Sequence, residues 1–376
     1  MQFDIIGAQC LRPDGFDHER LSVSDGCFVE APQHRRVDLD GYWVMPGIVD
    51  IHGDGFERHL APRRGAVSDL AAGLVAVEAE LAANGITTAV LAQFYSWEGG
   101  MRSPDFAQKF LCAHAAIMAN FDTDLRVQLR FETHMLDHYV RFFDLVCTYD
   151  VPYVVFNDHV PHDALAAGKK PPRLTGQALK SGRSPAAHLS LLKTLQAGAG
   201  GVPSALCRLA GQLKGRKTLL GSHDDSDAQM RQASHAIGVG IAEFPETAVA
   251  AETAMALGGT VVLGAPNVVR GESHQGNANA AELAKSGLCS ALASDYHYPS
   301  LRFAALALAK TIGIERAWRM ISSGPAQMLG LTDRGTITPG LRGDFIVLNP
   351  QNGRVMACFA KGRTSYMTAA IAERLF

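Results

Sequence analysis

The chain has 376 residues, of which 47% are hydrophobic and 19% charged, and its formal net charge is −2. This length fits one large domain with an appendage, or two domains of ordinary size. The nearly neutral charge excludes a protein that binds nucleic acid through its total charge. No run of about 18 uncharged apolar residues occurs, and the first residues lack a basic segment followed by an apolar one, so we expect neither a membrane span nor a secretory signal.

The seven cysteines are scattered along the chain, and none of them belongs to a CxxC pair. This pattern argues against a thiolate metal site or a disulfide framework and is typical of a reducing compartment, so we expect a cytoplasmic protein. The chain also has 14 histidines, whose placement must decide whether they bind a metal or act in acid–base chemistry.

Both ends of the chain predict short strands. Residues 3–11 and 27–32 are brief apolar runs separated by segments rich in turn-forming residues. Residues 335–349 resemble them as a strand, a Pro-Gly turn and a second strand, and residues 353–363 continue the pattern. Because the termini of a domain often lie close together, we expect the two ends to pair into one small sheet.

Between these ends, eight strand-like apolar runs alternate with stretches of helical periodicity. The runs cover residues 43–52, 86–94, 125–132, 152–158, 217–223, 241–245, 260–266 and 288–295. The helical stretch 68–85 is rich in Ala, Leu and Glu and ends on the stop signal Asn84-Gly85. This alternation predicts an α/β protein with a (β/α)8 TIM-type barrel. An open doubly wound sheet is the alternative, but neither GxGxxG nor GxxxxGK[ST] occurs.

Polar residues with metal-binding chemistry stand at the ends of several of these strands, where a barrel gathers its catalytic groups. Imidazoles and carboxylates without cysteine favour Zn²⁺, with Mn²⁺ or Fe²⁺ as alternatives. Two ions would need a shared carboxylate, and Glu132 has the right type and place. We therefore predict one or two divalent ions bound by a set drawn from His52, Asp54, Glu132, His159, His223 and Asp295.

Basic and amide side chains follow the first, fourth and seventh strands, on the loops that would surround this metal centre. They are Arg58, His59 and Arg63, then Lys169 and Lys170 within a basic loop at 161–187, then Asn267 and Arg270. Arginine forks and the N–H groups of glycine-containing loops bind phosphate oxygens. We therefore predict a small anionic, phosphorylated substrate, with neither nucleic acid nor a membrane as partner. His274, in a polar loop, is either a substrate contact or a turn residue.

Several segments resemble the amidohydrolase superfamily over essentially the whole chain. Residues 44–52, Val-Met-Pro-Gly-Ile-Val-Asp-Ile-His, resemble its first-strand signature, and residues 322–348 resemble its closing segment. The resemblance implies a metal centre at the mouth of the barrel and a small β-sandwich built from both termini. We accordingly expect residues 1–45 and 336–376 to form the sandwich domain and residues 46–335 to form the barrel.

Other blocks resemble the PhnM branch, the diphosphatases of phosphonate metabolism. They are HGD at 52–54, ERHLAPRRG at 57–65, RFETH at 130–134, DHVP at 158–161, GSHDD at 221–225, AEFPET at 242–247, GAPNVVRG at 264–271 and LASDY at 292–296. The resemblance implies hydrolysis of α-D-ribose 1-methylphosphonate 5-triphosphate with release of pyrophosphate. Two positions depart from the usual patterns: Asp54 replaces the second histidine of the superfamily, and residues 160–164 replace a Gly/Gln-rich run of the branch.

Under this hypothesis, Asp295 orients a metal-bound water and accepts its proton, while the basic residues neutralise the triphosphate. One alternative is that the same metal centre hydrolyses a C–N bond in a cyclic amide, an N-acyl compound or an aminopurine. Another is a catalytically inactive barrel that serves as a scaffold. We also expect a homo-oligomer, a dimer.

Overall fold

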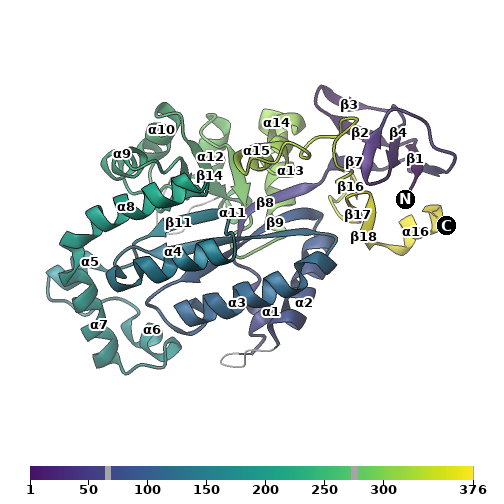
Figure 1. Ribbon diagram of the computed structural model, residues 1–376. Coiled ribbons are helices and arrows are strands. Elements are labelled where there is room, and N and C mark those ends of the chain that lie inside the picture. Colours follow the sequence, from purple (N-terminus) through teal and green to yellow (C-terminus); the bar gives the residue numbers. More distant parts are fainter. Residues whose placement is uncertain (64–68, 272–277, 376) are drawn as a thin grey trace. The chain divides into compact units, whose positions relative to one another are not determined.

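The computed structural model describes residues 1–63, 69–271 and 278–375 (Figure 1). The chain forms two compact units. Unit 1 comprises Met1–Leu91, Ile117–Arg126 and Thr260–Phe376, and unit 2 comprises Ala92–Ala116 and Val127–Gly259. This division does not follow the expected boundaries near residues 45 and 336, so those boundaries stay a prediction.

Eight strands form the central parallel sheet, and they follow one another in strict chain order. They are β8 (Ile48–Gly53), β9 (Ile86–Tyr95), β10 (Asp124–Glu132), β11 (Tyr153–Asn157), β12 (Leu219–His223), β13 (Ile241–Glu243), β14 (Thr260–Gly264) and β15 (Ala291–Ala293). Within unit 1, a parallel bridge between Gly53 and Asp295 links the last strand to the first and nearly closes the sheet. Each of the eight predicted runs overlaps one of these strands, which confirms the (β/α)8 barrel.

Helices alternate with these strands, as the periodicity predicts. They are α1 (Glu57–Leu60), α2 (Leu70–Ala83), α3 (Pro104–Ile117), α4 (Tyr139–Thr148), α5 (His162–Ala166), α6 (Leu174–Lys180), α7 (Pro185–Ala197), α8 (Val202–Gly215), α9 (Ala228–Ala236), α10 (Ala248–Ala256), α11 (Ala265–Arg270), α12 (Ala280–Lys285), α13 (Ser300–Ile312), α14 (Ile314–Arg319), α15 (Ser323–Met328) and α16 (Ala369–Leu375). Short 3₁₀ turns cover Gly100–Arg102, Met118–Asn120, Leu136–His138 and Ala199–Gly201.

Helix α2 shows how the local sequence sets its ends. Asp69 caps its start by accepting the N–H of Ala71, and Asn84 follows its last residue. Gly85 has a φ of +80°, a left-handed conformation that glycine adopts without a steric penalty. The predicted stop is therefore confirmed, while Ser68, the expected first residue, lies outside the described residues.

The terminal strands form two further sheets in unit 1, where the N-terminal and C-terminal strands lie side by side (Figure 1). The four-stranded sheet has the order β5-β4-β1-β6, and the six-stranded sheet has the order β18-β17-β16-β7-β2-β3. Their bounds are β1 (Phe3–Ile6), β2 (Gln9–Arg12), β3 (Gly15–Asp17), β4 (Leu21–Ser24), β5 (Cys27–Val29), β6 (Arg36–Asp38), β7 (Trp43–Pro46), β16 (Phe345–Leu348), β17 (Val355–Ala360) and β18 (Arg363–Met367).

The two ends pair in the six-stranded sheet, as expected, and the N-terminal segment also forms a second, four-stranded sheet of its own. Two sheets allow the apolar faces of both to be buried against each other. Phe3 and Phe28 of one sheet pack against Phe345 of the other, with ring centroids 6.5 and 6.1 Å apart. Phe345 also stacks on Phe359 at 4.4 Å. This core confirms the β-sandwich formed by both termini.

No helix among the described residues is both long and apolar enough to cross a membrane. All seven cysteines are free thiols, as their spacing predicted, and three of them are buried. Burial raises the pKa of the Cys10, Cys289 and Cys358 thiols to about 12. These three side chains therefore act as small apolar groups of the core.

An ion pair at the start of β10 gives unit 1 a pH-dependent contribution to stability. Arg334 donates to Asp124 at 2.6 Å and to Thr88 at 2.8 Å, and it is almost fully buried. Burial alone would raise the pKa of the Asp124 carboxyl, but the guanidinium groups of Arg126 and Arg334 outweigh it and lower that pKa. The ionised carboxylate therefore stabilises the fold at neutral pH.

We expect Asp124→Asn to lower the free energy of unfolding at pH 7 by about 1.5–3 kcal/mol, as for loss of a hydrogen bond to a charged group. A carboxyl group whose pKa is lower in the folded than in the unfolded protein stabilises the fold at pH values above its unfolded pKa of about 3.9. This stabilisation is lost as the pH falls through the folded-state pKa. The deficit measured by urea unfolding should therefore be smaller at pH 3 than at pH 7. An equal deficit at both values would refute this origin, and the exposed variant Asp14→Asn is the control.

Candidate metal centre

Four neighbouring strands of unit 2 carry a candidate ligand at or just beyond their carboxyl ends. Strand β10 ends at Glu132, β12 at His223 and β13 at Glu243, while His159 stands two residues beyond the end of β11. Parallel strands of a barrel direct these ends to one face, where catalytic groups gather. The unit therefore brings together three predicted ligands and one residue, Glu243, that the prediction left out.

Glu132 and His159 form a short, buried contact. The side chain of Glu132 has no exposed surface, and its Oε1 lies 2.5 Å from Nδ1 of His159. Its Oε2 accepts the backbone N–H of His159 and the indole N–H of Trp97, at 3.2 and 3.1 Å. Burial would raise the pKa of Glu132 and lower that of His159, but their mutual attraction outweighs it and shifts both pKa values the other way. Each group therefore stabilises the charged form of the other.

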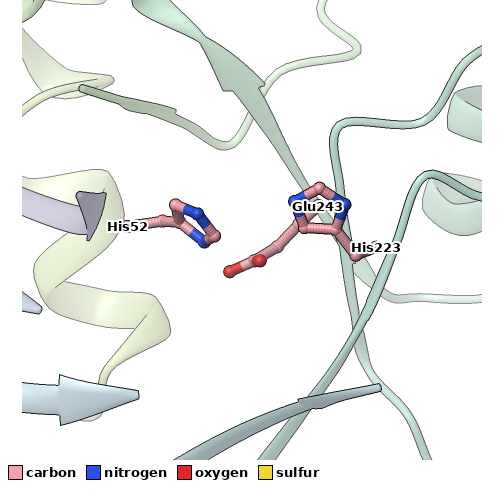
Figure 2. Close-up of side chains that lie close together, drawn as sticks. All are labelled: His52, His223 and Glu243. Atoms are coloured by element: carbon pink, nitrogen blue, oxygen red, sulfur yellow. The ribbon is translucent and has the colours of Figure 1, made fainter. Parts of the chain in front are cut away.

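His223 and Glu243 are direct partners across the β12–β13 pairing, and Figure 2 shows both side chains at these strand ends. Their candidate ligand atoms lie within 4.8 Å of each other. Oε1 of Glu243 accepts hydrogen bonds from Gln128 at 2.7 Å and from the hydroxyl of Tyr153 at 2.6 Å. These two buried donors hold the carboxylate in one orientation, which is the support that a metal ligand requires.

The sequence offered only a weak signal for Glu243. It lies in the middle of the shortest apolar run, 241–245, and the segment 242–247 resembles a family motif that assigned no role to its carboxylate. The other candidate ligands are polar residues at the ends of buried strands, and the same criterion would have selected Glu243. The next residue, Phe244, has a φ of +51°, an uncommon conformation for a bulky residue and a further mark of a functional turn.

A second grouping shares His223. Ligand atoms of His159, His223 and Asp224 all lie within 4.8 Å of one another. Nδ1 of His223 is 2.9 Å from Oδ2 of Asp224. Burial would raise the pKa of the Asp224 carboxyl, but the adjacent His223 outweighs it and lowers the pKa to about 2. Asp224 therefore presents an ionised oxygen beside two imidazole rings.

Arg130 is a buried cation in this unit that sequence reasoning missed. It lies on β10 two residues before Glu132, so both side chains leave the same face of the strand. Only 4% of the residue is exposed. Its guanidinium carbon is 3.9 Å from the ring centroid of Phe94, and its Nη2 is 2.9 Å from Nε2 of His223. A buried arginine at the ligand cluster favours an anion in the same place.

Unit 1 positions His52 and Asp295 at the junction of β8 and β15. The fully buried carboxylate of Asp50 accepts the hydroxyl and the backbone N–H of Ser294, at 2.5 and 3.0 Å. Asp295 donates its N–H to the carbonyl of His52 at 3.0 Å, and its own carbonyl accepts the N–H of Asp54 at 2.8 Å. Figure 2 also draws His52, at the end of β8.

Asp295 has a φ of +54°, so its backbone is in the left-handed region that non-glycine residues seldom adopt. Such conformations persist where the surrounding bonds hold them, and they concentrate at functional sites. The bridge to Gly53 and the backbone bonds to His52 and Asp54 supply these constraints. The end of β15 therefore holds a carboxylate in a fixed and strained turn.

The predicted basic residues of unit 1 already have partners within the protein. Arg58 forms an ion pair with Glu80 of α2 and also donates to the carbonyl of Tyr296 at 3.2 Å. Nε2 of His59 contacts the other oxygen of Glu80 at 2.5 Å. One carboxylate thus offsets both groups. Arg63 is exposed, and Arg64 lies outside the described residues.

The two remaining groups of predicted substrate ligands are more exposed. Arg270 donates to Oδ1 of Asn267 at 2.9 Å at the end of α11. Lys169 and Lys170 are exposed between α5 and α6. The interpretation of 161–187 as a loop is wrong, because this segment folds into α5, α6 and the start of α7, with Leu174 buried on α6. His274 lies outside the described residues.

The donor set fits a divalent transition metal. Imidazole nitrogens and carboxylate oxygens are the ligands that Zn²⁺, Mn²⁺ and Fe²⁺ accept, and the nearby donors of unit 2 include both types without a thiolate. The carboxylates of Glu132 and Glu243 are further oriented by hydrogen bonds from Trp97, Gln128 and Tyr153.

A nearly closed (β/α)8 barrel, imidazoles and carboxylates at its strand ends and a β-sandwich from both termini together define a protein of the amidohydrolase superfamily type. Solved structures of this type share the fold. N-acetylglucosamine-6-phosphate deacetylase from Thermotoga maritima aligns with a TM-score of 0.61 at 15% identity, over 97% of this chain and 100% of that one. Beta-aspartyl dipeptidase from Fervidobacterium islandicum AW-1 aligns with a TM-score of 0.62 at 13% identity, over 98% and 99%.

A curated relative narrows the assignment. The chain is 30% identical over 329 residues to alpha-D-ribose 1-methylphosphonate 5-triphosphate diphosphatase of Escherichia coli (strain K12). The alignment covers 85% of this chain and 86% of that protein. No family model matches the chain. The chain belongs to the family of this diphosphatase, the PhnM branch of the amidohydrolase superfamily, and is a hydrolase.

Proposed function

We propose that this protein is a metal-dependent diphosphatase of phosphonate metabolism. Its substrate is α-D-ribose 1-methylphosphonate 5-triphosphate or a close relative, and its product is pyrophosphate. The observation that carries the proposal is the buried guanidinium of Arg130 beside His223, within a cluster of imidazole and carboxylate ligands. A neutral amide substrate would gain little from that cation, whereas a phosphoryl group is matched by its fork of N–H donors.

We infer that His52, Glu132, His159 and His223 hold one or two divalent ions, with Asp54 as a further ligand. Glu243 joins this set because its carboxylate is the partner of His223 and is fixed by Gln128 and Tyr153. Zn²⁺ is the proposed ion, ahead of Mn²⁺ or Fe²⁺.

A bound divalent ion would lower the pKa of a water molecule towards neutrality and polarise the phosphoryl oxygen. The Asp295 carboxylate accepts the proton of an attacking water as the oxygen of that water bonds to the phosphorus nearest the ribose. The bond from that phosphorus to the bridging oxygen breaks, and pyrophosphate leaves with the electron pair. Backbone bonds to His52 and Asp54 keep Asp295 oriented throughout, so little reorganisation is required.

Arg130 stabilises the negative charge that develops on the phosphoryl oxygens. Its burial and its contact with Phe94 prevent it from swinging into water, so its donors are already directed when the substrate binds. Arg63, Asn267, Arg270, Lys169 and Lys170 remain proposed contacts to the outer phosphates. Arg58 and His59 also remain proposed contacts, and within the protein both contact Glu80.

The function is tested by incubating the metal-reconstituted protein with ribose 5-triphosphates and identifying the released phosphate. We expect pyrophosphate and a ribose 5-phosphate product in equal amounts, with activity that falls as salt screens the basic residues. Orthophosphate as the first product would refute the diphosphatase. Hydrolysis of amides without any action on triphosphates would favour the C–N hydrolase instead. Absence of bound metal and of activity with added metal would favour the scaffold.

The cytoplasmic location and the homodimer predicted from the sequence also belong to this proposal. The free state of all seven cysteines is consistent with a reducing compartment. Light scattering in solution tests the proposed dimer, for which we expect a mass twice the chain mass of 40.2 kDa.

A further inference from the structure

Unit 2 contains a second cluster of metal-binding side chains, which the proposed catalytic set does not use. His134 follows the end of β10 by two residues, Asp158 follows the last residue of β11, and His162 is the first residue of α5. One donor atom from each lies within 4.8 Å of the others. Nε2 of His134 and Nε2 of His162 are 3.1 and 3.0 Å from the same oxygen, Oδ2 of Asp158.

The hydrogen bonding of His134 directs its second ring nitrogen at the carboxylate of Asp158. Its Nδ1 lies 3.3 Å from the carbonyl oxygen of Leu195, which can only accept, so Nδ1 carries the proton. In the neutral ring, Nε2 then has a lone pair that faces the carboxylate of Asp158. Two acceptors at this distance repel each other unless a positive charge lies between them. A proton on Nε2 or a metal ion bound by both atoms supplies that charge, and the test below distinguishes the two.

The spacing of the donors also suits a metal ion. In a tetrahedral site with bonds of about 2.0–2.1 Å, neighbouring donor atoms lie about 3.3 Å apart. The separations of 3.0–3.1 Å between each imidazole nitrogen and the carboxylate oxygen are close to that value. An ion would need only a small outward shift of each side chain. A water molecule would complete the fourth position.

The three side chains are held in place and remain accessible. The backbone N–H of Val160 donates to Oδ1 of Asp158 at 3.1 Å and so holds the carboxylate; Oδ2 faces both rings, while Oδ1 also lies 3.2 Å from Nε2 of His162. Gln196 donates to the backbone carbonyl of His162 at 3.1 Å and so anchors the start of α5. The side chain of His134 is buried, whereas those of Asp158 and His162 are 30% and 39% exposed, so an ion can enter from solvent.

We propose that His134, Asp158 and His162 form a second divalent-cation site, distinct from the proposed catalytic centre and suited to Zn²⁺. The carbonyl of Leu195 is the supporting acceptor that sets the tautomer of His134, an arrangement common behind metal-binding histidines. A bound ion links α5 to the ends of β10 and β11. It therefore fixes the start of the segment that carries Lys169 and Lys170.

The test is the number of zinc ions bound per chain. Metal-free protein is dialysed against micromolar free Zn²⁺, and its metal content is measured by mass spectrometry. We expect His162→Gln and His134→Gln to bind one ion fewer than the wild type, while His235→Gln on α9, the matched control, binds the wild-type number. If folded His162→Gln binds as much zinc as the wild type, the proposal is wrong, and a proton rather than a metal ion lies between these side chains.

A second variant separates this site from the catalytic centre. His223→Ala disrupts the proposed catalytic ligands, and we expect it to keep an ion that is lost when His162→Gln is added. If His223→Ala and His162→Gln each lose all bound zinc, the chain has a single site and the proposal fails. If the stoichiometry behaves as expected but no triphosphate is hydrolysed, the proposed function fails and the second site stands.

Discussion

Asp295→Asn is expected to lower kcat by a factor on the order of 10²–10⁴, the range that a positioned general base contributes. Asparagine keeps the size of the side chain and tolerates the left-handed backbone at φ +54°, so the fold should persist. It cannot accept the proton of the attacking water. Steady-state kinetics of pyrophosphate release measures the effect, and metal content is measured on the same sample.

Asp150→Asn is the matched control for this experiment. Asp150 also has a left-handed backbone, with φ +47°, but it is exposed and pairs only at the surface with Arg216. The same chemical change there should leave kcat and metal content at wild-type values. Full activity of Asp295→Asn with every triphosphate tested would show that another group acts as the base. Loss of bound metal in Asp295→Asn would assign the residue a role as a ligand.

Glu132→Gln is expected to reduce metal affinity and kcat/KM by at least about 100-fold, since even residues that only support a ligand change these quantities by about 10–100-fold. Both carboxylate oxygens of Glu132 accept hydrogen bonds, from the ring and backbone of His159 and from Trp97. A glutamine must turn its NH₂ group towards one of these donors, whichever way it is oriented. The buried polar clash should also cost about 1–3 kcal/mol of stability.

Glu252→Gln provides the comparison, because Glu252 is an exposed residue of α10. It should retain wild-type metal content, kinetics and thermal midpoint. Metal affinity is measured by competition with a chelator, and stability by thermal unfolding of the metal-free proteins, so that ligand loss is separated from unfolding. Wild-type metal affinity in Glu132→Gln would exclude this residue from the ligand set.

Local sequence patterns were enough to predict the barrel, but they did not predict which distant segments of the chain contact one another. The helix that ends at Asn84-Gly85 and the eight strand runs depend on capping residues and on continuous burial, which neighbouring residues express. The strand pattern of the two ends predicted that they pair, but it did not show which strands form the four-stranded sheet and which the six-stranded one, because a strand pattern does not identify its partner. The segment 161–187 was interpreted as a loop from its charges, although Leu174 anchors α6 in the protein interior.

The sequence alone determined the order of the barrel strands and the imidazoles and carboxylates that follow them. Strand formation and side-chain chemistry are properties of short segments, so they can be recognised without knowing what lies across the sheet. The tertiary structure decided which groups meet. It paired Arg130 with His223, fixed Glu243 through Gln128 and Tyr153, and offset the charge of Arg58 with Glu80.

The physical reason is that a charged side chain acquires its role from its partners. Arg58 and Arg130 have the same guanidinium group and both lie near the carboxyl end of a barrel strand, but Arg58 is exposed and paired with Glu80, whereas Arg130 is buried beside His223. The near-neutral total charge is therefore a property of the whole chain and does not describe the charge at any one site. The local charge that a phosphorylated substrate would meet depends on contacts between residues far apart in the chain.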